Sequence, residues 1–156
     1  LGRGSFSVEG FNRSPVASLF HLAHADILVQ DWPLWANALV LFWALLLGHA
    51  LADFPLQGEF LAVGKDRHAD LSAVTGGNTW PKGMWLYCLT IHSFIQATCV
   101  WVVTGSVVIS VIEFVLHWFI DLAKNEGCTN FYVDQGLHVA CKAIYAILFF
   151  AGITWP

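Results

Sequence analysis

The sequence predicts an all-α polytopic membrane protein, a four-transmembrane-helix bundle preceded by an N-terminal interfacial amphipathic helix. Composition is the first reason, because 57% of the 156 residues are hydrophobic and 12% are charged, whereas soluble domains carry about 25% charged residues. The second reason is that four apolar stretches each approach the roughly 20 residues needed to cross a bilayer. An uninterrupted apolar run at residues 39–47 argues against a very apolar soluble bundle.

Residues 1–33 are predicted to form an extramembrane arm that contains the amphipathic helix. Ser14 suits a helix N-cap and Pro15 suits the first helical position. Apolar residues then recur at helical spacing, but the segment is too short and too polar to span a bilayer. We expect it to lie at the membrane interface or against a partner. The partner-contact candidates are Phe20, His21, His24, Trp32 and Trp35.

Residues 34–156 are predicted to form the transmembrane domain. Gly105 marks a tight hairpin between the second and third helices, while Asn125 and Gly127 supply helix-stop chemistry before the fourth. The longest loop joins the first two helices. Because the chain runs up and down, this loop and the loop before the fourth helix share one end, here named the long-loop side. The predicted helices are at about 34–54, 84–104, 106–123 and 134–155.

Loop charge predicts the orientation of these helices. Cationic residues are more numerous on the long-loop side than on the opposite side, which has only Arg3 and Arg13. The positive-inside rule therefore predicts a cytoplasmic long-loop side, with both termini outside. The long-loop cations are Lys65, Arg67, Lys82 and Lys124.

Each predicted transmembrane helix carries a histidine toward the long-loop side, with ionisable or amide partners four residues away. This spacing stacks the partners on one helical face. Ionisable groups at membrane depth are costly, so the cluster is a functional-site hypothesis. The metal or polar-network candidates are His49, Asp53, His92, Glu113, His117, Asp121, Asp134 and His138. The supporting residues are Gln57, Gln96, Lys124, Gln135 and Lys142. No catalytic residue is assigned.

Three chemical states fit this cluster. Imidazole and carboxylate ligands suit a divalent metal, namely zinc, manganese or iron. A metal-free network of paired His, Asp and Lys side chains is the second state. Haem or chlorophyll with His92 as axial ligand is less favoured, because a porphyrin does not need the neighbouring carboxylates. We favour a metal by a small margin, since carboxylates outnumber cations in this half of the membrane.

Some of these residues also have a structural interpretation. Asp134 could cap the N-terminus of the fourth helix, and Asp53 could cap the short segment that begins at Pro55. Lys142 lies deeper than His138, so it should snorkel to the interface, pair with a carboxylate such as Glu113, or stay neutral.

Three ordered motifs resemble a known family. They are HALADFPLQ at residues 49–57, with Lys65 beyond it, then HWFIDLAK at 117–124 and DQGLH at 134–138. Together they resemble the small bacterial and phage membrane proteins grouped as domain of unknown function 3307. The resemblance implies a polytopic helical membrane protein, placed in the bacterial inner (cytoplasmic or intracytoplasmic) membrane, whose His, Asp, Gln and Lys positions form a shared site. It implies no activity.

Two function classes remain. The first is an accessory or structural subunit of a larger membrane complex, for example an energy-transducing photosynthetic or respiratory one, because a 17.3-kDa chain with little extramembrane mass is poorly equipped to work alone. The second is a metal-dependent membrane hydrolase acting on a lipid or headgroup, with Glu113 or Asp121 as base. The expected partners are the lipid bilayer and other membrane-protein subunits, and no nucleic acid.

Overall fold

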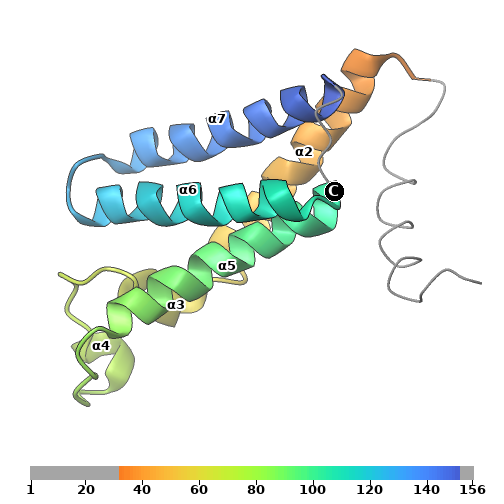
Figure 1. Cartoon of the computed structure of the whole chain (residues 1–156). Coiled ribbons are helices and arrows are strands. Elements are labelled where there is room, and N and C mark those ends of the chain that lie inside the picture. Colours follow the sequence, from red (N-terminus) through yellow and green to blue (C-terminus); the bar gives the residue numbers. More distant parts are fainter. Residues whose placement is uncertain (1–31, 152–156) are drawn as a thin grey trace, which may run out of the picture.

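The computed structural model describes residues 32–151, and all regular structure in this range is α-helical. Two short helices, α3 (Gly58–Gly64) and α4 (Ser72–Thr75), occupy the loop between the first two long helices (Figure 1). The four long helices are α2 (Leu34–Asp53), α5 (Met84–Thr104), α6 (Val107–Asn125) and α7 (Phe131–Phe150). The predicted amphipathic helix, with Phe20, His21 and His24, lies outside the described residues.

The helix ends follow local capping chemistry. Gly105 ends α5 with a left-handed φ of 67°, a conformation that suits glycine, and its N–H donates to the carbonyl of Trp101. The Ser106 side chain then caps α6 by accepting from the N–H of Ile109. At the start of α7, Asn130 accepts from the N–H of Val133 at 3.0 Å. This cap starts α7 at residue 131, earlier than the 134 predicted from the sequence.

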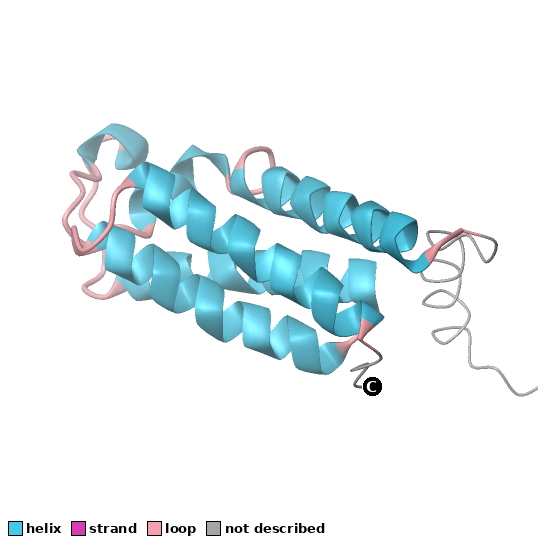
Figure 2. Cartoon of the chain, turned by 90° about the horizontal axis from the view of Figure 1, so that it is seen from above, coloured by secondary structure: helices cyan, strands magenta, loops and turns pink. Residues whose placement is uncertain are grey.

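Each long helix packs against two others. Helix α5 contacts α2 and α6, and α7 also contacts α2 and α6, while α3 packs on α5. Figure 2 shows the long helices running side by side, with the connections gathered at their two ends. The residues at 54–83 and 126–130 lie at the same end, as the predicted topology requires, and they form the long-loop side. The turn at Gly105 lies at the other end, named the hairpin side.

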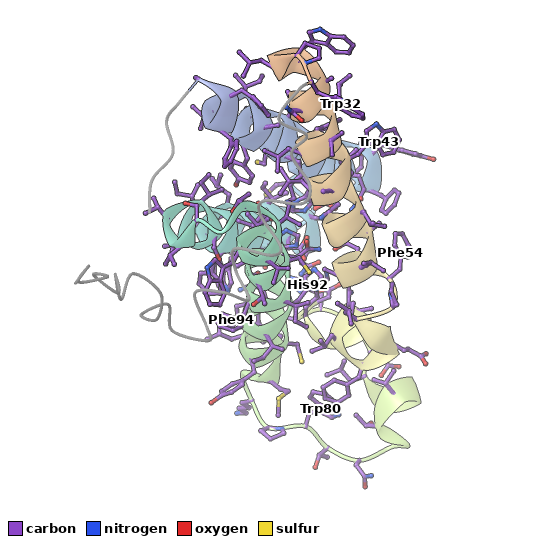
Figure 3. All side chains as sticks on the ribbon, turned by 90° about the vertical axis from the view of Figure 1, so that its right-hand side faces the viewer. Trp32, Trp43, Phe54, Trp80, His92 and Phe94 are labelled. Atoms are coloured by element: carbon purple, nitrogen blue, oxygen red, sulfur yellow. The ribbon has the colours of Figure 1, made fainter. Side chains whose placement is uncertain are left out.

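The interior changes character along its length. Near the hairpin side it is apolar, built from Leu41, Leu45, Val100, Ile109, Tyr145 and Ala146. Toward the long-loop side it is polar, with His92, His117 and His138 each at most 1% exposed. Over all described residues, 14 buried polar or charged side chains outnumber 10 buried hydrophobic ones. Meanwhile Trp43 and Phe54 point outward from α2, at 69% and 71% exposure (Figure 3). Soluble proteins bury apolar side chains and expose charged ones, and this arrangement is largely the reverse.

Three helices, α2, α5 and α7, are long and apolar enough to cross a membrane, judged by length and composition. Helix α6 is nearly as long, but it carries Glu113, Asp121 and Lys124. Length and composition therefore support three of the four predicted spans. The span at α6 stays a prediction.

Candidate functional site

Helix α6 presents one polar face to the interior. Its buried residues recur every four positions, and Glu113, His117 and Asp121 are each only 1% exposed. The outward positions Val111 and Phe119 are 56% and 60% exposed. Because residues four apart share a helical face, this amphipathic pattern directs all three ionisable groups inward.

Two imidazoles meet at the centre of the polar half. The Nε2 atoms of His92 on α5 and His117 on α6 are 3.1 Å apart. Asp53, the last residue of α2, brings its Oδ1 to 3.4 Å from His92 Nε2. Asp121 Oδ2 lies 3.5 Å from His92 Nε2 and 3.8 Å from His117 Nε2. Nitrogen and carboxylate donors from three helices therefore converge on one point.

The remaining two histidines flank this point. The ring of His138 on α7 stacks on the ring of His117 with 4.0 Å between centroids, and its Nε2 lies 3.4 Å from Asp121 Oδ1. The ring of His49 on α2 lies 5.0 Å from that of His138. All four predicted histidines thus belong to one cluster.

A buried ion pair orients His117. Its Nδ1 lies 3.2 Å from Glu113 Oε1, and the same oxygen accepts from Lys142 Nζ at 2.5 Å. Both Glu113 and Lys142 are essentially inaccessible to solvent. Of the alternatives considered for Lys142, the structure has the one in which it pairs with Glu113. A carboxylate can only accept, so the hydrogen of a neutral His117 sits on Nδ1 and its Nε2 offers a lone pair.

Lysines neutralise three of the four buried carboxylates. Lys142 contacts Glu113, and Lys124 bridges Asp121 and Asp134 at 3.3 and 2.8 Å. Lys65 adds a 2.6-Å contact to Asp121 Oδ2. Asp53 differs from the other three, because no described lysine or arginine lies within ion-pair distance of it.

Amide side chains join the carboxylates across helices. The Gln96 amide nitrogen donates to Asp53 Oδ1 at 2.5 Å, and its Oε1 accepts from His49 Nδ1 at 3.1 Å. The four-residue spacing predicted that Gln96 shares a face of α5 with His92; both are buried, and the amide reaches across to α2. Gln135 lies 3.2 Å from carboxylate oxygens of both Asp53 and Asp134.

Some predicted positions have roles outside the central point. Asn130, rather than Asp134, caps α7, so the proposed capping role of Asp134 was wrong. The Asp134 carboxylate instead accepts a hydrogen bond from Lys124. The Gln57 amide, in the orientation that satisfies both groups, bonds the main-chain oxygen of Asp53 and the N–H of Ala62. It therefore links α2 to α3 through the backbone. Trp32 and Trp35 are exposed.

Lys65 was not among the candidates named from helical spacing, and only the family resemblance placed it in a shared site. It follows α3 in the long loop, yet it is only 7% exposed and reaches the cluster through Asp121. Asn125 fixes its backbone by donating to the Lys65 carbonyl at 2.9 Å, and Arg67 pairs with Glu126 nearby. The only sequence signal for Lys65 was its place beyond the first family motif.

Two groups of side chains are spaced to hold a metal ion. Asp53, His92 and His117 form one, and His117, Asp121 and His138 form the other, with one ligand atom of each residue within 4.8 Å of the others. In the second group, the Lys124 ammonium already contacts Asp121. The first group has no such cation among the described residues and is the better candidate.

Comparison with known proteins identifies one family. The family described as "Protein of unknown function (DUF3307)" matches residues 41–155, which include every long helix except the first turns of α2. No curated protein and no solved structure matches the chain.

Proposed function

We propose that this chain, which belongs to the DUF3307 family of unknown function, is a four-helix integral membrane protein that binds one divalent metal ion through Asp53, His92 and His117. The metal ties α2, α5 and α6 together, and the protein serves as an accessory or structural subunit of a larger membrane assembly. Zinc fits the donor set best, ahead of manganese and iron, because two imidazoles and a carboxylate suit its four-coordinate geometry.

The charge balance at Asp53 carries this proposal. The cluster has four buried or nearly buried carboxylates, and among the described residues three lysines reach Glu113, Asp121 and Asp134 but not Asp53. Asp53 accepts from the amides of Gln96 and Gln135 and faces the imidazoles of His49 and His92. It has no permanently charged partner among the described residues, and a carboxylate without one in a low-dielectric interior is costly. A cation held between Asp53, His92 and His117 supplies the missing positive charge at the one place that lacks it.

Two of the three donor separations are close to those of a tetrahedral zinc site. Ligands 2.0–2.2 Å from a tetrahedral zinc ion are about 3.3–3.6 Å from one another. The observed separations are 3.1 Å between the two imidazole Nε2 atoms and 3.4 Å from His92 Nε2 to Asp53 Oδ1, while the ligand atoms of Asp53 and His117 lie within 4.8 Å of each other. Asp121 Oδ2 lies 3.5 and 3.8 Å from the Nε2 atoms of His92 and His117, but it already accepts from Lys65 and is not counted among the ligands.

The surroundings of His117 support a ligand role. Metal-bound histidines usually donate their other ring nitrogen to a carboxylate, which fixes the ring and raises its basicity. Glu113 takes this position, 3.2 Å from His117 Nδ1, and Lys142 holds Glu113 in turn. His117 is thereby positioned with its lone pair toward His92.

Burial favours a structural metal over a catalytic one. His92 and His117 are 0% and 1% exposed, so a lipid headgroup has no direct route to them. A membrane hydrolase therefore ranks second.

Metal analysis tests this function. The protein purified in mild detergent is expected to contain close to one zinc per chain, and removal of the metal by a chelator should lower the midpoint of thermal unfolding because the metal binds only the folded state. Substitution by cobalt should produce a tetrahedral visible spectrum that azide does not change. A chain without stoichiometric metal would contradict the proposal in favour of the metal-free network, and an azide-sensitive spectrum would favour the hydrolase.

The membrane topology is part of the same proposal. All four long helices cross the bilayer, α6 included, because its charged groups face protein rather than lipid. Neutralisation by Lys65, Lys124 and Lys142 supports this, since buried pairing is how intramembrane charge is tolerated. The long-loop side faces the cytoplasm of a bacterial inner membrane, so residues 32 and 151 lie toward the outer side.

Cys128 provides a reporter of this orientation. It is exposed in the connection between α6 and α7 on the long-loop side. A membrane-impermeant maleimide should therefore label Cys128 in inverted vesicles and leave it unmodified in intact spheroplasts. The buried Cys88 serves as a control that stays unlabelled in both. Labelling of Cys128 from the outside would overturn the orientation.

A further inference from the structure

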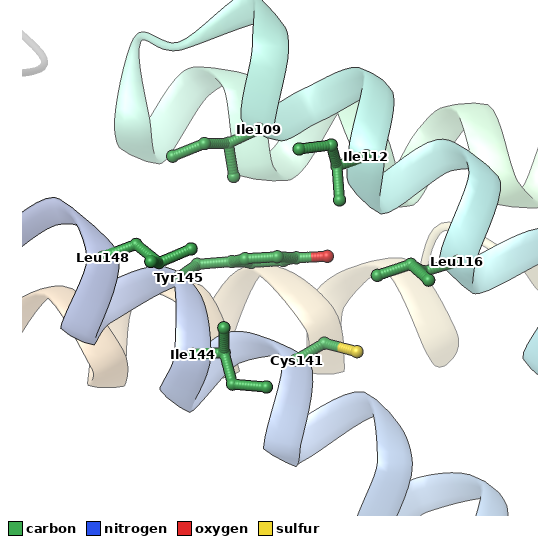
Figure 4. A pocket seen from close by; sticks show the side chains of 7 residues that line it. All are labelled: Ile109, Ile112, Leu116, Cys141, Ile144, Tyr145 and Leu148. Atoms are coloured by element: carbon green, nitrogen blue, oxygen red, sulfur yellow. The ribbon is translucent and has the colours of Figure 1, made fainter. Parts of the chain in front are cut away.

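The two ends of the polar cluster are covered by different kinds of side chain. On the hairpin side the interior is apolar, and the cavity of about 130 Å³ between α6 and α7 is lined mainly by aliphatic side chains such as Ile109, Ile112 and Leu148 (Figure 4). Such a lining gives a charged group no polar path. On the long-loop side, residues 65–68, here named the strap, follow α3 and reach the cluster through Lys65. Charge therefore reaches the cluster from the strap side and not from the hairpin side.

The strap is attached to α5 and α6 by a few polar contacts. Asn125, the last residue of α6, donates to the Lys65 carbonyl at 2.9 Å. The Arg67 guanidinium pairs with Glu126 and lies 5.8 Å from the ring centroid of Trp85. The side chains of this ion pair are 45% and 26% exposed, and exposed ion pairs contribute little free energy. The outer part of the strap is therefore weakly attached.

Helix α3 is attached more firmly than the strap. A Cβ atom added at Gly64 would lie 2.8 Å from Cys88 Sγ, so the end of α3 packs closely against α5. Gly64 and Cys88 are both buried. The strap can consequently detach while α3 stays in place and Cys88 remains covered.

One oxygen of Asp121 has two possible cationic partners. Asp121 Oδ2 accepts from Lys65 Nζ at 2.6 Å, and it lies 3.5 and 3.8 Å from the Nε2 atoms of His92 and His117. The latter distances are close to those between ligands of one zinc ion. An ammonium group and a metal ion on the same oxygen repel each other. Lys124 contacts Oδ1, so Asp121 keeps a cation when Lys65 leaves.

We propose that Lys65 couples the position of the strap to the affinity for the metal. While the strap is docked, Lys65 holds Asp121 Oδ2, and zinc has the three ligands Asp53, His92 and His117. When the strap detaches, Oδ2 joins zinc as a fourth ligand and zinc binds more tightly. Because coupling between two sites is reciprocal, zinc in turn favours the detached strap. This inference rests on the metal site of the proposed function.

The zinc affinity of the metal-free full chain tests the coupling. The dissociation constant is measured in mild detergent by competition with a fluorescent chelator. Lys65→Met should bind zinc about 5–150-fold more tightly than wild type, the usual range for coupled sites. Asn125→Ala loosens the strap without changing any charge, so it should bind zinc about two- to tenfold more tightly, as expected for one lost hydrogen bond. Lys82→Met, an exposed change in the long loop outside the strap, should leave the affinity unchanged.

Glu126→Gln separates release of the strap from a simple charge effect. Loss of a negative charge by itself weakens the binding of a cation. Loss of the ion pair with Arg67 instead loosens the strap, so zinc should bind about two- to fivefold more tightly. The two explanations therefore predict changes of opposite sign.

Hydrogen–deuterium exchange of residues 65–68 follows the strap directly. In wild type, saturating zinc should speed exchange in this segment about threefold or more, because local opening sets the exchange rate. In Lys65→Met, whose strap has lost its contact with Asp121, zinc should have no such effect.

Three results would overturn the coupling and leave the metal site intact. They are stoichiometric zinc in wild type with no gain of affinity in Lys65→Met and Asn125→Ala, weaker zinc binding in Glu126→Gln, and slower exchange of residues 65–68 on addition of zinc. A wild-type chain that binds no zinc would instead overturn the proposed function, and the coupling with it.

Discussion

Replacing His117 by alanine is expected to abolish stoichiometric metal binding. The residue offers its Nε2 at the point where His92 and Asp53 also converge, and Glu113 fixes its ring. Loss of an outer-shell partner typically weakens metal binding by about 10–100-fold, so loss of a direct ligand should cost more than ~100-fold. Elemental analysis of the purified variant should fall from about one zinc per chain to a trace level.

Matched variants separate the two candidate metal groups. His92→Ala should lose the metal as His117→Ala does, because both imidazoles belong to the preferred group. His138→Ala should retain it, since His138 belongs only to the group that Lys124 already neutralises. His68→Ala replaces an exposed histidine of the long loop and should keep the metal, so it controls for metal lost during purification. Metal loss in His138→Ala but not in His92→Ala would assign the metal to the other group.

Replacing Lys142 by methionine is expected to lower the free energy of unfolding by about 3–5 kcal/mol. Lys142 and Glu113 form a fully buried pair at 2.5 Å, and removing one partner leaves a buried charge without compensation. The free energy of unfolding can be measured in mixed micelles by titration with a denaturing detergent. The free energies of unfolding of wild type and variants should be compared at the same pH and the same metal concentration.

The paired variant shows whether charge is the cause. Lys142→Met combined with Glu113→Gln removes both charges, so most of the lost stability should return, as found when buried pairs are replaced together. Lys82→Met, an exposed change in the long loop, should be close to neutral. A Lys142→Met protein as stable as wild type would contradict a structural role for the pair.

Local periodicity was sufficient to predict much of the site. Glu113, His117 and Asp121 recur at four-residue spacing, and helix geometry alone puts them on one face. The hairpin at Gly105 and the loop chemistry near Gly127 then bring histidines from different helices to the same end of the molecule. These features depend on residues within one helical turn of each other or on the up-and-down direction of the chain, and both can be read from the sequence.

Contacts between helices were not predictable in the same way. Spacing puts Gln96 on the same face of α5 as His92, but it gives no sign that Gln96 bonds His49 and Asp53 on α2. Lys65 comes from a loop, and no periodic pattern indicates which carboxylate it reaches. Such pairings depend on the rotation of each helix about its axis, which packing of side chains sets and one-dimensional spacing does not.

By itself, the sequence determined the helical class, the apolar outer surface and the set of ionisable residues, because these follow from composition and periodicity. Only the tertiary structure decided which carboxylates a lysine neutralises. Lys65, Lys124 and Lys142 reach Asp121, Asp134 and Glu113, and Asp53 is left facing imidazoles. The physical reason is that charge compensation depends on distances of a few ångströms between helices, and helix packing alone sets those distances.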